Sequence, residues 1–435
     1  MTPVIRHLQE TFPELSLDRI KNPLKCTFIE SIQRLGPEFY RKIISMHLVL
    51  NLEYSLLGQQ LRAKFLSPQP VDQEELREQL LAALMMAELL EYVYQYYLDI
   101  PREVVRLREQ QNLYRELLNV ITPDFPQNPK NIPENFSFTQ NLRNRIMDYN
   151  LWRLLITRSK RALDLLAAVN TGSKSYLGFV SAMDTVMDPV LRHLGWFFWL
   201  PRLFVNFYSL FKHSVPGWWM DDREKSLGWA VRFSAQIKRR YFEFGNDIVW
   251  VTSGLINTFY LTGALAPVAF YVSLAVFAFD VLLAITRAYI ELSRIYELRA
   301  QYESMKANSP QEEKQIREHI KALDKQIAFE QFRLGSHVAT TSFILLGMCM
   351  ALPIFAVNPI IPFIGAVILV MVCFANFQIT EEIARRRPQD TFDKASALSK
   401  LGFFNTKEHP PVELEQLSKK DKEELLEIED SICCI

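Results

Sequence analysis

Long apolar runs alternate with charged stretches in the C-terminal half of the chain. Between positions 248 and 285 the only charged side chain is Asp280, and between 338 and 377 there is none. One helix needs roughly 20 apolar residues to cross a bilayer, so each run is long enough to cross and to return. The pattern therefore predicts two hydrophobic hairpins, within residues 236–286 and 336–388.

Turn-forming residues divide each apolar run in two. Gly263 and Pro267 interrupt the first run, since glycine allows a tight turn and proline is tolerated in the first turn of the returning helix. Asn358, Pro359 and Pro362 interrupt the second run. We expect four membrane spans, at 247–264, 267–286, 338–357 and 360–378.

Basic residues gather at one set of span ends. Lys and Arg near a span favour the cytosolic side, so the N-terminus, the stretch between the hairpins and the C-terminus are all expected in the cytosol. The residues that determine this orientation are Arg239, Arg240, Arg287, Arg385, Arg386 and Arg387. The alternative is four core helices of a large soluble protein, but such cores rarely carry basic residues at only one set of ends.

Residues 287–335, between the hairpins, mix charges of both signs at helical spacing. Ser309 and Pro310 break the stretch and precede Glu312 and Glu313, an order typical of an N-cap and an acidic first turn. We expect an antiparallel helical hairpin, continuous with the second and third spans, that is either a docking arm or a spacer. An apolar stripe at coiled-coil spacing runs through it: Ile295, Leu298, Tyr302, Met305, Ile316, Ile320, Leu323 and Ile327.

The N-terminal half reads as two helical blocks. Residues 1–122 carry apolar residues at spacings of three and four, which predicts a helical bundle. A Pro-rich linker, 123–138, separates it from a second helical block, 139–235. No convincing strand pattern appears in either block, so the expected fold class is all-α throughout, with the membrane hairpins following the two blocks.

The segment 195–211 is dense in aromatic residues. Tryptophan suits a membrane interface, where its ring stays half in lipid and half in water. We therefore interpret the segment as an interfacial helix, with Trp196, Trp199, Trp218 and Trp219 as anchors. A fifth span and a buried soluble helix are the alternatives, and a fifth span would move residues 1–190 to the opposite side of the membrane.

Charge and motifs narrow the classes of function. Lys plus Arg and Asp plus Glu number 49 each, so no overall field favours nucleic acid. The seven histidines are dispersed, without an HExxH pattern, and residues 172–175 (GSKS) lack the first glycine of a phosphate-binding loop. The sequence thus predicts no catalytic residue, no cofactor and no metal site, and the favoured interpretation is that the protein is not an enzyme.

Asp280 is the candidate functional residue within the membrane. A carboxylate inside a span is costly to place and usually has a partner or a proton. One interpretation is a proton or ion pathway. The other is a structural pairing with Arg287, Asn257 or Asn376.

Residues 389–435 form a charged C-terminal tail that ends KKDKEELLEIEDSICCI. This acidic end resembles the glutamate-rich secretion signal of type IVB (Dot/Icm) effectors of intracellular bacteria. Cys433 and Cys434 are candidate lipidation sites because a Cys-Cys-x ending resembles some geranylgeranylated tails, although the standard prenylation box is not met. S-acylation and unmodified thiols are the alternatives.

The layout of two hairpins around a helical cytosolic stretch resembles the bilobed inclusion-membrane proteins of intracellular bacteria and the hairpin proteins that curve membranes. Together with the tail, it implies a secreted effector in a host membrane that scaffolds, tethers or recruits. Its expected partners are the lipid bilayer and either a protein or a second copy, bound through 287–335 or 1–122. A transporter or channel, or a membrane-anchored enzyme, would be the alternative.

Overall fold

The computed structural model describes residues 2–14, 32–67, 72–98, 100–122, 125–126, 129–132, 138–169, 173–197, 199–355, 357–392, 394, 397–398 and 401. Within these ranges every regular element is a helix, which confirms the all-α class. The N-terminal helices are α1 (Pro3–Thr11), α3 (Pro37–Leu66), α4 (Gln73–Val93), the π-helix η2 (Tyr94–Leu98) and α5 (Pro101–Ile121).

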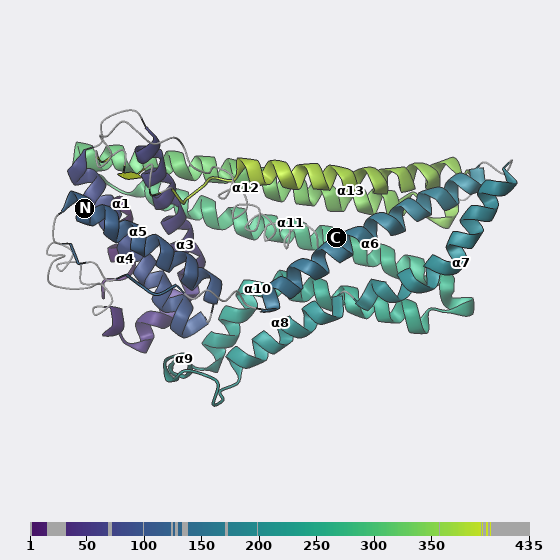
Figure 1. The fold of residues 1–435 in the computed structure, drawn as a ribbon, viewed down its shortest axis with the longest axis horizontal. Helices are drawn as coiled ribbons and strands as arrows, with labels where there is room; N and C mark the ends of the chain where they lie inside the picture. Colours follow the sequence, from purple (N-terminus) through teal and green to yellow (C-terminus); the bar gives the residue numbers. More distant parts are fainter. Residues whose placement is uncertain are drawn as a thin grey trace.

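Most of the remaining helices run along the length of the molecule (Figure 1). They are α6 (Phe138–Val169), α7 (Lys174–Phe197), α8 (Trp199–Ser214), the short α9 (Asp222–Ser226), α10 (Trp229–Leu255) with the π-helix η3 (Ile256–Tyr260), the 3-10 turn η4 (Gly263–Leu265), α11 (Ala266–Ser304), α12 (Pro310–Cys349), the 3-10 turn η5 (Pro353–Phe355) and α13 (Ile360–Arg386).

The N-terminal helices gather at one end of the molecule and form, with parts of α11 and α12, a region that we call the head (Figure 1). One hydrophobic core includes Leu57 of α3, Leu80 of α4 and Leu117 of α5 together with Tyr302 of α11 and Leu323 of α12. The predicted N-terminal bundle and the predicted arm are therefore built around a single core. The apolar stripe of the arm faces that core as well as the facing helix.

Cross-helix contacts give the direction of α11 relative to α12. Arg299 pairs with Asp324, the hydroxyl of Tyr296 accepts from Gln331, and Glu291 pairs with Arg333. Residue numbers rise on α11 as they fall on α12, so the two helices are antiparallel. At 1.5 Å per residue each is roughly 60 Å long, about twice the thickness of a bilayer core.

The predicted breaks lie at the ends of α11 and α12. Gly263 has φ 58°, a left-handed conformation that glycine adopts without strain, and α11 begins three residues later with Pro267 in its first turn. The Ser309 hydroxyl accepts a hydrogen bond from the Glu312 backbone N–H at 3.2 Å and Pro310 begins α12. The structure confirms these predicted breaks, because each depends only on a few neighbouring residues.

The second hairpin turns earlier than the sequence suggested. We expected a span to Val357, but α12 ends at Cys349, and residues 350–352 and 357–359 form turns on either side of the short helix η5. Pro353 is the physical reason: it lacks a backbone N–H, and its ring disfavours helical backbone at Leu352. The helical part of the third predicted span therefore ends eight residues before its predicted boundary at Val357.

Two of the four predicted spans meet the length and composition needed to cross a membrane. They are Gly263–Ser304, which contains α11, and Ile360–Arg386, which is α13. Among the described residues α10 and α12 do not meet these requirements. The structure is therefore that of an all-helical protein with two helices long and apolar enough to span a bilayer.

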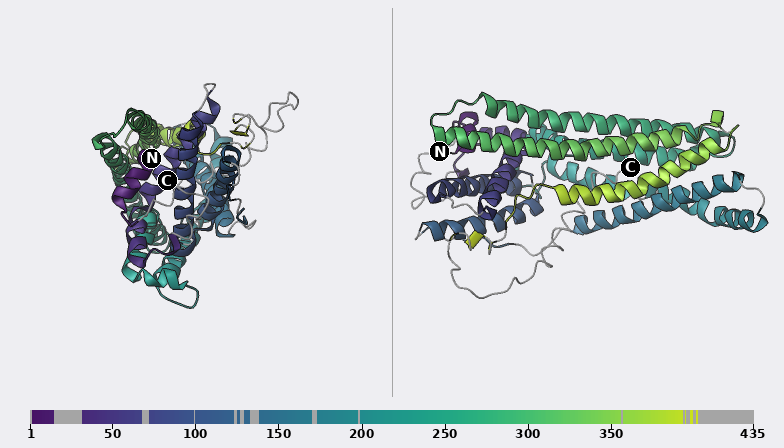
Figure 2. Two further views of the ribbon diagram at one scale, coloured as in Figure 1. Left: turned by 90° about the vertical axis from the view of Figure 1, so that its left-hand side faces the viewer. Right: turned by 90° about the horizontal axis from the view of Figure 1, so that it is seen from above.

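The helices α6, α7, α8 and α10 pack along α11, α12 and α13, away from the head (Figures 1 and 2). The end of α6 and the start of α7 lie at the same end of the molecule as the turns after α10 and α12 (Figure 1). We call this part, from α6 to α8 and the head-distal parts of α10 to α13, the long bundle. The helix α9 returns to the head, where Arg223 lies over the rings of Tyr92 and Tyr96 at 5.3 and 4.4 Å.

Candidate membrane-facing surface and its buried polar groups

The outer surface of the long bundle is apolar. Only 17% of the most apolar stretch of α11 and 33% of that of α13 is buried. A core helix of a soluble protein would be mostly buried, so this exposure favours lipid as the surrounding medium. The large exposed side chains of α11 to α13 include Leu282, Phe343, Leu346, Ile364, Met371, Phe374 and Phe377.

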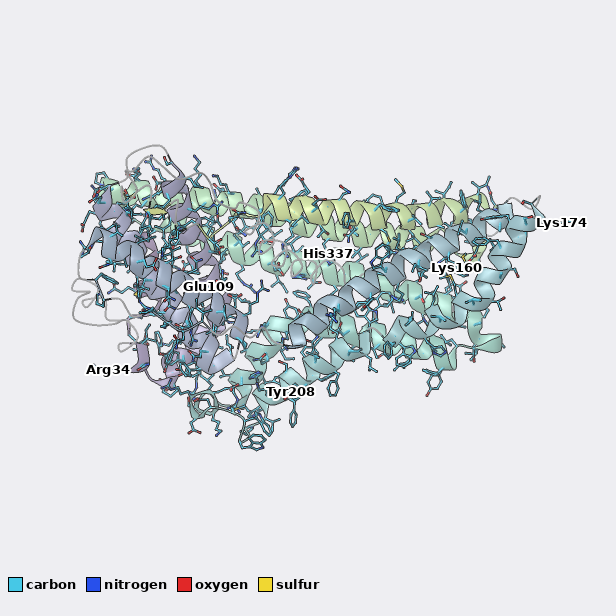
Figure 3. All side chains as sticks on the ribbon, viewed as in Figure 1. Arg34, Glu109, Lys160, Lys174, Tyr208 and His337 are labelled. Carbon is cyan, nitrogen blue, oxygen red and sulfur yellow. The ribbon has the colours of Figure 1, made fainter. Side chains whose placement is uncertain are left out.

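A charged belt, defined here as Arg287, Glu291, Glu330 and Arg333, lies where the apolar surface meets the head. Arg287 donates to Glu291 at 2.7 Å, and Arg333 donates to Glu291 at 2.6 Å and to Glu330 at 2.7 Å. Burial alone would raise the pKa of Glu291, but the two guanidinium groups hold it below its usual range. Glu291 therefore stays charged at neutral pH, and the belt joins α11 to α12 at the predicted membrane boundary. His337, labelled in Figure 3, follows it by one helical turn.

The other predicted orientation residues lie on α10 and at the end of α13. Arg385 and Arg386 both pair with Glu382, and the Arg386 guanidinium lies 4.8 Å from the ring of Phe332 on α12. Arg387 is the residue that closes α13. Arg239 and Arg240 are half-buried on α10.

Asp280 is buried, with 5% of its surface exposed, and faces α10. The indole N–H of Trp250 lies 3.2 Å from both of its carboxylate oxygens. The sequence-based interpretation named other partners: Arg287 instead donates to Glu291, and Asn257 donates to Ser273 at 3.1 Å. Trp250 is 30 positions away in the chain, so helix spacing alone could not have identified it.

Trp250 belongs to a line of aromatic and charged groups that continues into α8. Its ring stacks on that of Trp199 at 5.7 Å, and the Arg202 guanidinium lies 4.7 Å from the centre of the Trp199 ring. Arg202 also donates to Asp247 on α10 at 2.7 Å. Asp247 has none of its surface exposed and accepts a second bond from Asn206 at 2.9 Å. The aromatic pattern of 195–211 did not predict this pairing.

The four predicted tryptophan anchors lie in different surroundings. Trp218 and Trp219 are exposed, at 92% and 39%, between α8 and α9. Trp199 is only 4% exposed, and Trp196 is half-buried against Gly254 of α10. The structure thus places the ring of Trp199 inside the protein, whereas an interfacial anchor was expected. The segment 195–211 includes the end of α7 and most of α8.

Comparison with known proteins identifies no relative. No family model, curated protein or solved structure matches the chain. What the protein does is therefore inferred from its own residues.

A second group of buried polar residues joins the head to α11 and α12. Glu53 of α3 is 1% exposed and accepts a hydrogen bond from the Tyr302 hydroxyl at 2.9 Å. Burial raises the pKa of Glu53 to about 8, so it holds a proton at neutral pH. His7 of α1 lies 3.6 Å from the same carboxylate, and His319 of α12 packs on the Tyr302 ring.

Burial lowers the pKa of His319 to about 3, and it also lowers that of His7. His319 is bonded through Nδ1 to the amide of Gln60 at 2.9 Å. The group is therefore largely uncharged at neutral pH, which suits an interior contact between α1, α3, α11 and α12.

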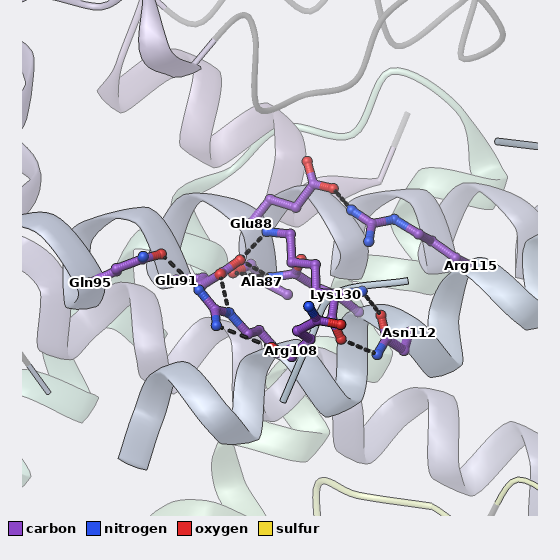
Figure 4. A network of polar contacts seen from close by, with 10 residues as sticks. Ala87, Glu88, Glu91, Gln95, Arg108, Asn112, Arg115 and Lys130 are labelled. Carbon is purple, nitrogen blue, oxygen red and sulfur yellow. Dashed lines mark hydrogen bonds and ion pairs between the residues drawn. The ribbon is translucent and has the colours of Figure 1, made fainter. Parts of the chain in front are cut away.

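A third polar network lies between α4 and α5 (Figure 4). Glu91 is bound by Arg108 and Lys130, and it accepts a bond from Gln111 at 2.9 Å. Burial alone would raise the pKa of Glu91, but its two cationic partners lower it. Glu88, one turn earlier, pairs with Arg115 inside the same interface.

Among the residues that the structure describes, no group of three or more His, Cys, Asp or Glu side chains is placed to hold a metal ion. The acidic tail and the candidate lipidation sites Cys433 and Cys434 lie outside the described residues. Of the cysteines that are described, Cys373 is buried and Cys349 half-buried.

Proposed function

We propose that the protein is an integral membrane scaffold that holds its helical head at the membrane surface. In this proposal α10 to α13 form two membrane hairpins of two spans each. The head lies in the cytosol, with the N- and C-termini on the same side.

The observation that carries the proposal is the continuity of α11 and α12. The helix α11 begins in the exposed apolar part of the long bundle, passes the charged belt and ends in the core of the head. The helix α12 begins in the head, passes the same belt and ends in the apolar part of the long bundle. Two antiparallel helices without a hinge would hold the head in a fixed orientation to the bilayer. A fixed head is what tethering or recruitment requires.

The partner of the head would be a protein or a second copy of this chain. The helices α1 and α3 to α5 share one core with the head parts of α11 and α12, so a partner would meet a single surface composed of both. Charged side chains of α12, among them Lys314 and Arg317, are turned to the solvent and are available for such a contact.

We extend the proposal to a bacterial effector that inserts into a host membrane. Its support is the resemblance of the acidic C-terminus to a type IVB secretion signal and of the layout to bilobed inclusion-membrane proteins. A translocation reporter fused to the full chain should reach the host cytosol, and deletion of residues 412–435 should abolish this. Translocation that survives the deletion would contradict the secretion signal while leaving the scaffold proposal intact.

A transporter or channel is the second candidate, favoured by the buried carboxylates Asp280 and Asp247 within the long bundle. Against it, Asp280 is bound by Trp250 and Asp247 by Arg202 and Asn206, which suits a structural role.

Reconstitution in liposomes separates the two candidates. A scaffold predicts no ion or solute flux above that of empty liposomes, for the natural chain and for Asp280→Asn alike. A reproducible flux that Asp280→Asn abolishes would contradict the scaffold proposal. Extraction at alkaline pH checks first that the protein is integrated in the bilayer.

A further inference from the structure

Residues 152–167 of α6 arrange their side chains in the opposite way to a helix in water. Along 152–167 the exposed positions are Trp152, Ile156, Thr157 and Leu166, none of them charged. The charged residues of this stretch are turned inward: Arg158 and Lys160 are 9% and 8% exposed, and Arg153, Arg161 and Asp164 are half-buried. A soluble helix exposes its charges and buries its apolar side chains.

The helices α7 and α8 show the same inversion. Their exposed large side chains are Leu177, Phe179, Val186, Val190, Phe197, Leu200, Phe204, Phe207, Tyr208 and Phe211. Figure 3 shows Tyr208 on the outer side of α8 and Lys160 within the bundle. An exposed apolar surface of this extent is rare on soluble monomers.

The inward charges pair across the helices. Lys160 lies 2.5 Å from Asp184 of α7 and 3.0 Å from Asp164 of its own helix. On the other side of the hairpin, Arg202 of α8 donates to the fully buried Asp247 of α10. Inside a bilayer, ionisable groups face the interior of a helix bundle and pair with one another, which is the arrangement found here.

The position of these helices matches that of the membrane hairpins. Arg158 of α6 donates to the Cys373 sulfur of α13 at 2.8 Å, so the middle of α6 lies beside the most apolar part of α13. On α10, a Cβ at Gly254 would lie 2.7 Å from the Cβ of Trp196, so α7 approaches α10 closely. The end of α6 and the start of α7 also lie at the same end of the molecule as the two apolar turns (Figures 1 and 2).

We propose that α6 and α7, continued by α8, form a third membrane hairpin, with lipid acyl chains on its outer face and its charges turned toward α10 and α13. This rests on the proposed insertion of α10 to α13. Lipid is the occupant because the outer face of this hairpin continues the exposed apolar surface of α11 and α13. Since the chain crosses and returns, the head stays on the cytosolic side, unlike the outcome of a single fifth span.

Labelling of an introduced cysteine tests the topology. The full chain, with its five natural cysteines replaced, is reconstituted in sealed vesicles with the head outside and treated with a membrane-impermeant maleimide. Ser173→Cys, at the start of α7, should stay unlabelled until detergent opens the vesicles, as should the reference Ala264→Cys. Labelling of Ser173→Cys while Ala264→Cys is protected would overturn the third hairpin alone. Labelling of both would also overturn the proposed membrane insertion.

A nitroxide probe then identifies what covers the outer face. Val186, 68% exposed on α7, is the test position, and Leu66, 60% exposed on α3 in the head, is its matched control. In the reconstituted chain, a probe at Val186→Cys should collide readily with oxygen and rarely with a water-soluble nickel chelate, whereas Leu66→Cys should show the reverse preference. Ready collision with the chelate at Val186 would indicate water. Little collision with either reagent would indicate a second copy or another protein, and both results overturn the proposal.

Discussion

Glu53 is an ionisable residue that lies in apolar surroundings. Nothing in the spacing of α3 distinguishes it from a solvated glutamate, yet it lies in the core of the head with Tyr302 as its hydrogen-bond donor. Its partner is 249 positions away in the chain. Contacts of this kind depend on how α3 meets α11, which local pattern does not determine. The same reason applies to Asp280 and Trp250.

The raised pKa of Glu53 predicts that the head is less stable at higher pH. Between its ordinary value of 4.5 and about 8 the folded chain keeps a proton that the unfolded chain releases, so stability falls as pH rises through this window. From pH 6.5 to 8 the loss is at most about 2 kcal/mol. Thermal unfolding of the detergent-solubilised protein, followed by circular dichroism, measures it.

The matched variant is Glu53→Gln, which cannot ionise and should lose this pH dependence. The comparison of the two proteins isolates Glu53, because the histidines with lowered pKa values, among them His7 and His319, contribute equally to the pH dependence of both. Equal pH slopes for the natural protein and the variant would contradict the assignment.

At the scale of the helices, the sequence predicted where helices begin and end better than it predicted which helices pack against one another. Ser309 and Pro310 begin α12 as expected, because a cap depends on its own turn. The apolar stripe of α11 and α12 indicated that these helices needed a partner, but not that the N-terminal bundle would be part of it. The sequence did not predict that the charged residues of α6 face inward, because side-chain spacing on a helix does not show which face is turned toward the rest of the protein.

The crossing of α12 and α13 depends on two glycines. A Cβ at Gly365 would lie 2.7 Å from the carbonyl oxygen of Gly347, closer than any stable contact. Small residues at such crossings are typical of membrane helices. Gly365→Ala should therefore destabilise the purified protein by about 1–3 kcal/mol despite the better helix propensity of alanine.

Gly335→Ala is the control, because an added Cβ there meets nothing within 4 Å and the position is likewise inside a long helix, α12. It should leave the unfolding temperature unchanged or raise it slightly. Equal effects of both substitutions on the unfolding temperature would show that the close crossing is unimportant.

At the scale of the whole molecule, the head and the long bundle form one continuous unit because α11 and α12 run through both. The sequence placed the charge-free turns and the basic flanks at opposite ends of the hairpins, and the fold keeps that polarity (Figure 1). The order of the elements along the chain was thus predictable from composition. How the N-terminal bundle and α6 to α8 pack on them was not, because that packing joins residues far apart in the sequence.

The central claim is that a bilayer separates the head from the apolar turns. Impermeant labelling of Lys314→Cys on α12 in the head and Asn358→Cys in the turn before α13 tests it most directly, in sealed vesicles prepared with the head outside. If a bilayer separates them, Lys314→Cys is labelled at once and Asn358→Cys only after detergent is added. Labelling of both positions in intact vesicles would contradict it.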